Sequence, residues 1–303
     1  MIRKLHQFAQ AEAGKAYSVR ELCRLFKVNR AWYYERQKGL AQPKTAENEL
    51  KTFVEQLLKD YAGYGVRRVT KALCKAGYVI GQHRVRRLLK KWGLAWQPLR
   101  KKKPQTTVPD PQAVGAENKL APAKKQGQLG EPNRGWVGDV VYVSTRKESG
   151  YLATLLDVYS RKVVGWALSP INDTALTLKA LQMAITQREP EAGLIHHTDH
   201  GSNYTSGAYR AQLAQIGAVV SHSRPGRPQE NGIAESFNKT VSYEKLYLEE
   251  YQNLSEVEAG LTDWLARIYN GGRLHSSLGY HSPVEFEQNW LAHKALSSGL
   301  VES

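Results

Sequence analysis

Three carboxylates stand where a metal-dependent reaction could use them. Asp139 interrupts the apolar, β-branched run 136–143, and Asp199 directly follows the short apolar run 193–198. Open α/β sheets commonly bind ligands at the carboxyl ends of such strands. Glu235 lies near the start of an expected helix, where its charge complements the helix dipole. Two strands and a helix that each supply a carboxylate could hold two Mg²⁺ ions, one activating an attacking oxygen and the other stabilising a leaving oxygen in phosphoryl transfer.

Each of these carboxylates also has a simpler interpretation. An unpaired buried carboxylate costs several kcal/mol, so Asp139 must reach water or a partner. Asp199 could be a turn residue within the segment 197–202. Glu235 could be a solvated helical residue, because helical periodicity puts an apolar stripe on the side away from it: Ile233, Phe237, Val241 and Leu248. Taken singly, none of the three establishes a site.

Two further groups compete for a metal. Asp157 ends the second expected strand, before Tyr159-Ser160-Arg161, and we interpret it as a turn or structural residue. A zinc cluster is the other alternative, formed by His196, His197, His200 and His222. The spacing of His197 and His200 is too short for a helical ligand pair and no Cys is nearby, so the sequence disfavours zinc.

The carboxylates belong to a stretch with alternating strand and helix patterns. Strands are expected at 136–144, 151–158, 162–168, 193–198 and 218–221, and helices at 174–188, about 206–216 and about 230–250. The order β-β-β-α-β-α-β-α predicts a mixed sheet flanked by helices. Three meandering strands followed by alternation is the layout of the ribonuclease H-like fold.

The charge of the chain is concentrated before this stretch. The 303 residues contain 43 Lys and Arg against 28 Asp and Glu, a net charge of +15. Up to Gly130 there are 28 basic and 9 acidic residues, a net charge of +19, and the remainder has a net charge of −4. Because Lys and Arg neutralise phosphates, a cationic front predicts binding to nucleic acid. The alternative is a basic surface that only keeps the protein soluble.

Short helices with glycine-containing turns fill the cationic front. Ser18 and Glu21 are spaced as a capping box, and helical patterns follow at 50–58, 66–77 and 85–93. A basic final helix is typical of a helix-turn-helix DNA reader, although a helical bundle with a solvated cationic face is the alternative. The candidate DNA contacts are Arg67, Arg68, Arg84, Arg86, Arg87, Lys90, Lys91, Arg100, Lys101, Lys102 and Lys103.

The predicted organisation is a multidomain α+β chain. It has helix-turn-helix-like units at 1–43 and 44–98, a basic and largely extended linker at 99–130, a mixed α/β catalytic core at 131–250 and a C-terminal helical extension at 251–303. The mean hydropathy is −0.52, and no apolar run approaches the ~18 residues that span a bilayer. Two Cys and no signal-peptide core complete the expectation of a cytoplasmic protein without a membrane partner.

Five motifs together resemble one family. Asp139 precedes Asp199 by 59 intervening residues, and Asp199 precedes Glu235 by 35, which matches the D-D-E pattern of retroviral-type integrases and many transposases. The surrounding segments look like the catalytic, second-frame protein of the bacterial insertion-sequence family three transposases: 136–143, 156–161, 197–204, 231–237 and 269–278. The likeness runs from about Leu50 to Phe286.

The resemblance implies a transposase with an integrase-like catalytic core. Asp139, Asp199 and Glu235 would bind two Mg²⁺ ions, with Mn²⁺ as a substitute, to cut at the element's terminal inverted repeats and join the 3′ hydroxyl to target DNA. Lys239 resembles the integrase lysines that contact the DNA end, whereas Ser242 stands where the family often has a second basic residue.

The same resemblance implies partners besides double-stranded DNA. Pairing two DNA ends suggests a homo-oligomer, at least a dimer, and many such transposases gain a helix-turn-helix and zipper from an upstream frame. Two other functions stay open: an inert DNA-binding regulator of transposition, and a ribonuclease H-like nuclease that cuts without joining.

Overall fold

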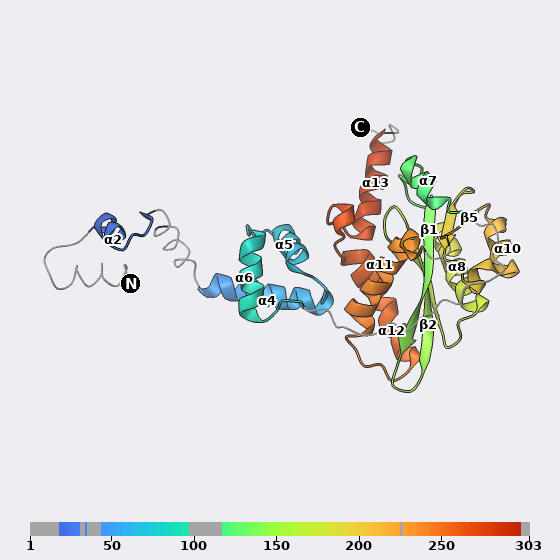
Figure 1. The fold of residues 1–303 in the computed structure, drawn as a ribbon, viewed down its shortest axis with the longest axis horizontal. Coiled ribbons are helices and arrows are strands. Elements are labelled where there is room, and N and C mark those ends of the chain that lie inside the picture. The colour runs from blue at the N-terminus through green and yellow to red at the C-terminus, as the bar shows by residue number, and fades with distance from the viewer. Residues whose placement is uncertain (1–17, 31–33, 35–43, 97–116, 225–226, 298–303) are drawn as a thin grey trace. The chain divides into compact units, whose positions relative to one another are not determined.

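The computed structural model describes residues 18–30, 34, 44–96, 117–224 and 227–297 (Figure 1). The chain divides into two compact units, residues 1–57 and residues 58–303. Within the described ranges, no helix combines the length and apolar character needed to cross a membrane.

The first unit contains helix α2, Val19–Leu25, which begins where its sequence signal lies. The Ser18 hydroxyl accepts the backbone N–H of Glu21, and the Glu21 carboxylate accepts the backbone N–H of Ser18 at 2.8 Å. This reciprocal pair satisfies two donors at the helix start and confirms the predicted capping box. Most of the predicted helix-turn-helix-like unit 1–43 lies outside the described residues.

Helix α4, Lys44–Asp60, spans the boundary between the units, and α5 and α6 follow in the second unit. Helix α5 runs over Val66–Lys75 and α6 over Gln82–Trp92, and each buries its predicted apolar stripe. Gly93 ends α6 with φ 71°, a left-handed conformation that a residue without Cβ adopts at little cost. The predicted helix pair is therefore confirmed, although α5 ends two residues before the predicted end and α6 begins three residues before the predicted start.

The sheet of the second unit has five strands in the order β3-β2-β1-β4-β5. Strand β1 pairs antiparallel with β2 and parallel with β4. All five strands lie where the sequence predicts them: β1 Gly135–Ser144, β2 Ser149–Asp157, β3 Val163–Ser169, β4 Ile195–Thr198 and β5 Val219–His222.

Helices cover both faces of this sheet (Figure 1). On one side lie α8, Thr174–Arg188, and α10, Gly207–Gln215, which is preceded by the short α9, Ser202–Thr205. On the other side lie α11, Gly232–Val241, and α12, Leu254–Asp263. Neighbouring residues of β1 serve the two cores, because Trp136 packs with α8 and α10 while Val137 packs with α11 and α12. This is the mixed, two-sided arrangement of a ribonuclease H-like core.

The single long helix expected over about 230–250 is wrong. The structure has a 3₁₀ turn η1, Pro228–Asn231, then α11, then a π-helical turn η2, Ser242–Leu246. Leu248 is 47% exposed and does not continue the apolar stripe. The π-helical turn η2 is wider than an α-helical turn, so the residues after it no longer follow the helical periodicity counted from α11.

Two segments outside the predicted core 131–250 pack with it. Within the expected extended linker 99–130, helix α7, Leu120–Lys125, buries Leu120 and Ala123 in the same core as α11, while 97–116 lies outside the described residues. The expected extension 251–303 is helical, but α12 and the π-helical η3, Trp264–Gly272, supply much of that core. These segments therefore share the hydrophobic core that lies between the sheet and α11.

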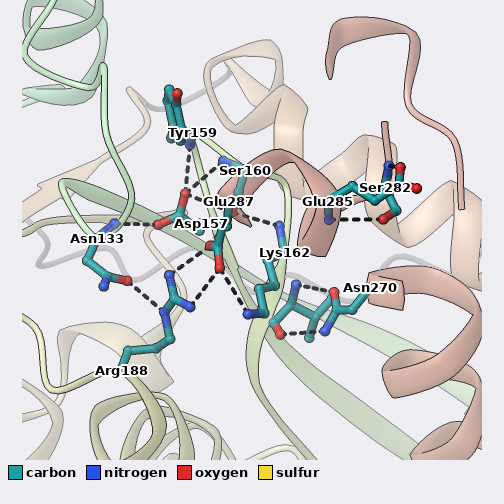
Figure 2. Close-up of polar contacts among 11 residues, drawn as sticks. Asn133, Asp157, Tyr159, Ser160, Lys162, Arg188, Asn270, Ser282, Glu285 and Glu287 are labelled. Carbon is teal, nitrogen blue, oxygen red and sulfur yellow. Dashed lines mark hydrogen bonds and ion pairs between the residues drawn. The ribbon is translucent and has the colours of Figure 1, made fainter. Parts of the chain in front are cut away.

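The last described helix, α13, Pro283–Ser297, is fixed by a buried polar network (Figure 2). Glu287 accepts hydrogen bonds from Ser160, Lys162 and Arg188 at 2.8 to 3.0 Å. Asp157 accepts the backbone N–H groups of Asn133, Tyr159 and Ser160. Burial raises the pKa of Asp157 while these hydrogen bonds oppose the rise. The interpretation of Asp157 as a structural turn residue is confirmed.

The network predicts a large stability difference between two glutamates of α13. Glu287→Gln leaves Arg188 and Lys162 without a countercharge, and breaking such a buried pair costs about 3–5 kcal/mol. Glu285→Gln is the matched control, since Glu285 is half-exposed and Gln also serves its capping role at Ser282. Urea unfolding should show a loss of about 1 kcal/mol or less for the control. Equal losses for the two variants would contradict the assignment.

Candidate active site

The alternation of β1 directs Asp139 toward helix α11. Val137 and Val141, two residues either side of Asp139, both lie in the core beneath α11. Side chains at every second residue share one face of a strand, so Asp139 faces the same helix. Its Oδ2 accepts a hydrogen bond from Nδ2 of Asn238 at 2.6 Å, and its Oδ1 accepts the N–H of Val140 at 2.8 Å. Asp139 is half-buried and therefore both oriented and accessible.

Strand register brings Asp199 beside Asp139. In the parallel ladder Trp136 pairs with His196 and Val137 with His197. Continuing the ladder by two residues places Asp199 opposite Asp139, and adjacent strands lie about 4.8 Å apart. Burial raises the pKa of Tyr204 well above its ordinary value, and the negative charges of both aspartates raise it further. The two carboxylates thus act on one buried ring, as neighbours should.

A short turn holds the Asp199 carboxylate. Its Oδ1 accepts the backbone N–H of Gly201 at 3.0 Å, just before α9 begins. The backbone carbonyl of Asp199 lies 3.0 Å from both Thr198 Oγ1 and His222 Nδ1. The residue is therefore fixed at its main chain and at one carboxylate oxygen.

Helix α11 docks its first turns against the centre of β1. Nδ2 of Asn231 donates to the carbonyl of Gly138 at 2.9 Å, and Asn238 donates to Asp139. A Cβ on Gly138 would lie 2.7 Å from Leu155 and 3.2 Å from Thr198, so a side chain there would push neighbours apart. Glu235 is half-buried and three residues before Asn238, which places the two on one side of the helix. The helix that contacts Asp139 thus also carries Glu235.

The donor atoms at this place suit a hard cation. Asp139, Asp199 and Glu235 offer carboxylate oxygens, and the buried Oδ1 of Asn238 has no hydrogen-bond partner among the described residues, although Nδ2 of the same amide donates to Asp139. Mg²⁺ prefers such oxygen ligands. The described residues nevertheless contain no set of three His, Cys, Asp or Glu side chains close enough to hold a metal. The register of β1 and β4 predicts that the two aspartates are neighbours, and no three-carboxylate group that includes Glu235 is found among the described residues.

Asn238 is a residue that sequence reasoning missed. Its signal was available, because it stands three residues after Glu235 and therefore near it on any helix. Asparagine mid-helix carries no chemistry of its own in a sequence pattern, however, and its contact with Asp139 depends on how α11 docks.

The histidines support strands β4 and β5. His196 faces the opposite side of the sheet and lies 3.1 Å from the Tyr209 hydroxyl. His197 Nδ1 lies 2.8 Å from Ser221 Oγ, and its Nε2 lies 3.2 Å from Ser223 Oγ. Burial lowers the pKa of His196 to about 3 and of His197 to about 4, so both rings are neutral near pH 7. Because these histidines bond to separate hydroxyls on two faces, the zinc alternative finds no support in them.

These two rings make stability depend on pH. The unfolded chain binds protons at His196 and His197 below about pH 6.5, whereas the folded chain does not until about pH 4 or lower. The free energy of unfolding should therefore fall on acidification through pH 6 to 5, by about 1.4 kcal/mol per pH unit for each ring. Urea unfolding at several pH values should show that the free energy of unfolding of His197→Asn depends less steeply on pH than that of the wild type. An unchanged pH dependence would exclude His197 as a cause of the acid destabilisation.

The predicted DNA contacts divide into two groups. Arg67 and the five cations of α6 are exposed: Arg84, Arg86, Arg87, Lys90 and Lys91. Arg68 is half-buried, and its Nε donates to the carbonyl of Leu274 at 3.0 Å. Lys239 is exposed one turn after Glu235. The expected contacts Arg100, Lys101, Lys102 and Lys103 lie outside the described residues.

Matches to known protein families divide the chain into an HTH-like part and an integrase core. Two families described as integrase core domains match residues 130–228 and 217–283, and an HTH-like domain matches residues 46–103. The transposase for insertion sequence element IS629 of Shigella sonnei is 32% identical, over 91% of this chain and 93% of that protein. The transposase InsF for insertion sequence IS3A of Escherichia coli K12 is 30% identical, over 91% and 96%. This chain belongs to the IS3 family of insertion-sequence transposases.

The family assignment confirms the predicted fold class. An HTH-like unit precedes an integrase core, and the second integrase match crosses the expected boundary at residue 250 as the shared core does. The HTLV-2 integrase catalytic core domain, solved in complex with magnesium, is 20% identical, with a TM-score of 0.42 over 52% of this chain and 97% of that one. With this TM-score, the comparison assigns no role to individual residues of this chain.

Proposed function

We propose that this transposase cleaves a phosphodiester at the ends of its insertion sequence and joins the freed 3′ hydroxyl to target DNA. Asp139, Asp199 and Glu235 are the proposed ligands of two Mg²⁺ ions, which Mn²⁺ could replace. The observation that supports this proposal is the parallel pairing of β1 with β4 up to Val137 and His197, two residues before each aspartate, together with the contact between Asp139 and the helix that carries Glu235.

The chain's own residues orient the donors for this reaction. Asn238 holds one oxygen of Asp139, and the Gly201 amide holds one oxygen of Asp199. Bound metal ions supply activation of the attacking oxygen and stabilisation of the leaving oxygen. Residues fixed before the substrate arrives do not need to reorganise during the reaction. Lys239, exposed on the turn after Glu235, is placed to contact the DNA that approaches them.

Double-stranded DNA is the proposed partner of the exposed cations on α5 and α6. The name of the HTH-like family and the net charge of +19 before residue 130 support this. Action on two element ends calls for a homo-oligomer on the bacterial nucleoid, at least a dimer. An upstream-frame helix-turn-helix protein stays a prediction from the resemblance.

Catalysis is favoured over the two alternative functions. An inert DNA-binding regulator would not need two aspartates in register and a helix docked onto one of them. A nuclease that only cuts would not need the cationic helix pair that precedes the core.

Strand transfer should depend on each carboxylate. Labelled element-end DNA incubated with Mg²⁺ and Glu235→Gln, Asp139→Asn or Asp199→Asn should yield joined product at least about 100-fold more slowly than with wild type, since even outer-shell partners of metal ligands contribute 10–100-fold. Glu256→Gln, in the first turn of α12, is the matched control and should join normally. Cleavage without joining by wild type would favour the nuclease, and DNA binding without cleavage would favour the regulator.

The cations of α6 should govern affinity and its salt dependence. Arg86→Gln with Lys90→Gln removes two exposed charges and should flatten the slope of log affinity against log salt by about 0.9 for each lost phosphate contact. Lys147→Gln with Lys179→Gln removes two exposed charges from the integrase core and should change the slope little. Fluorescence anisotropy measures both slopes. Equal slopes for the two double variants would remove α6 from the DNA interface.

A further inference from the structure

A polar cavity of about 250 Å³ lies along α11, within one helical turn of Glu235. Gly232 and Ser236, which line it, stand on either side of Glu235 in that helix. Three arginines from separate parts of the second unit also line it: Arg68 of α5, Arg161 of the turn between β2 and β3, and Arg273 after η3. Two sequence motifs with no role in the carboxylate site, 156–161 and 269–278, therefore meet in one cavity.

The positive charge in this cavity exceeds its negative charge. Arg273 is 3% exposed and forms a two-pronged ion pair with Glu244 at 2.7 and 2.6 Å. Arg68 donates to a neutral carbonyl, that of Leu274. Nη1 of Arg161 is buried and has no hydrogen-bond partner among the residues that the structure describes. Buried donors without a partner are rare and costly, so Arg161 is prepared for an acceptor from outside the chain.

The surrounding side chains are affected by this excess charge. Burial and, to a smaller extent, the positive charges of Arg273, Arg68 and Arg161 together lower the pKa of His275 to about 2. Asp157 acts on Arg161 electrostatically, but its carboxylate is occupied by backbone N–H groups. The exposed residues Ser276 and Ser277 line the cavity and add hydroxyl donors. The cavity therefore offers guanidinium and hydroxyl donors to a small anion.

The backbone at Arg161 is consistent with a held donor. Its φ is 62°, in the left-handed region that arginine seldom adopts, and its N–H donates to the carbonyl of Asp157 at 2.9 Å. The buried hydrogen bonds of Asp157 fix this turn and thereby fix where the Arg161 side chain begins. An uncommon conformation kept in place by its surroundings is a feature of ligand-binding residues.

We propose that this cavity binds one phosphate group of a DNA backbone, with Arg161 and Arg68 as the main donors. Guanidinium groups present paired N–H donors that match phosphate oxygens. The inference rests on the proposed strand-transfer function, because the phosphate would belong to the strand that passes Glu235. Occupancy would fix the position of that strand along α11, so Arg161 is a positioning residue.

The test measures binding by the full chain to a labelled duplex that ends in its terminal repeat, in EDTA so that no strand is cut. Arg161→Gln should bind about tenfold more weakly and flatten the salt slope by about 0.9, the value for one phosphate contact. Arg161→Lys should keep the slope because it keeps the charge. Arg267→Gln removes an exposed arginine outside the cavity and is the matched control.

Neutralising single phosphates of the duplex as methylphosphonates identifies the contact. One position should weaken wild-type binding and leave Arg161→Gln binding unchanged. If Arg161→Gln binds like wild type, or is as sensitive as wild type to every position, the proposal is wrong. It is also wrong if inorganic phosphate raises the melting temperature of wild type but not of Arg161→Gln while their DNA affinities are equal, because the cavity would then take free phosphate.

This outcome is separate from that of the proposed function. Wild-type strand transfer together with unaltered Arg161→Gln binding would reject the phosphate cavity and leave the strand-transfer proposal intact.

Discussion

The parallel pairing of β1 with β4 is the interaction on which the candidate site depends. Its register puts Asp139 and Asp199 at the same level of the sheet although 59 residues separate them in the chain. A slip of one residue would turn one aspartate to the opposite face, because side chains alternate along a strand. Trp136 and Val137 prevent that slip by filling the two separate cores on either side of β1.

The second requirement is the docking of α11, and buried polar contacts specify it. Asn231 and Asn238 both reach β1, one at the carbonyl of Gly138 and the other at Asp139. Phe237 and Val241 bury the apolar side of the same helix. Apolar packing supplies the attraction, while the Nδ2 groups of the two asparagines set the helix position, because a buried N–H donor without an acceptor is costly. Glu235 and the arginine-lined cavity both take their places from this docking.

Much of this arrangement could be predicted from the sequence. Five apolar strands and the capped helix 174–188 have strong local patterns, and all lie where expected. The π-helical turn at Ser242–Leu246 has no such signal, so the predicted helix ran too far. The burial of Leu120 had no sequence signal either, because it lies in a segment rich in Pro and Lys. Two apolar residues in so short a helix do not establish a helical periodicity. The cavity depends on arginines from three distant segments, and only the tertiary fold brings them together.

The position of a bound metal ion tests the candidate site most directly. Crystals soaked in Mn²⁺ report its position by anomalous diffraction, without any need for DNA or turnover. We expect an anomalous peak between the carboxylates of Asp139 and Asp199, on the side of the sheet that faces α11. This peak should be lost in Asp139→Asn. Manganese bound elsewhere in these crystals would contradict the proposal that Asp139 and Asp199 hold the metal.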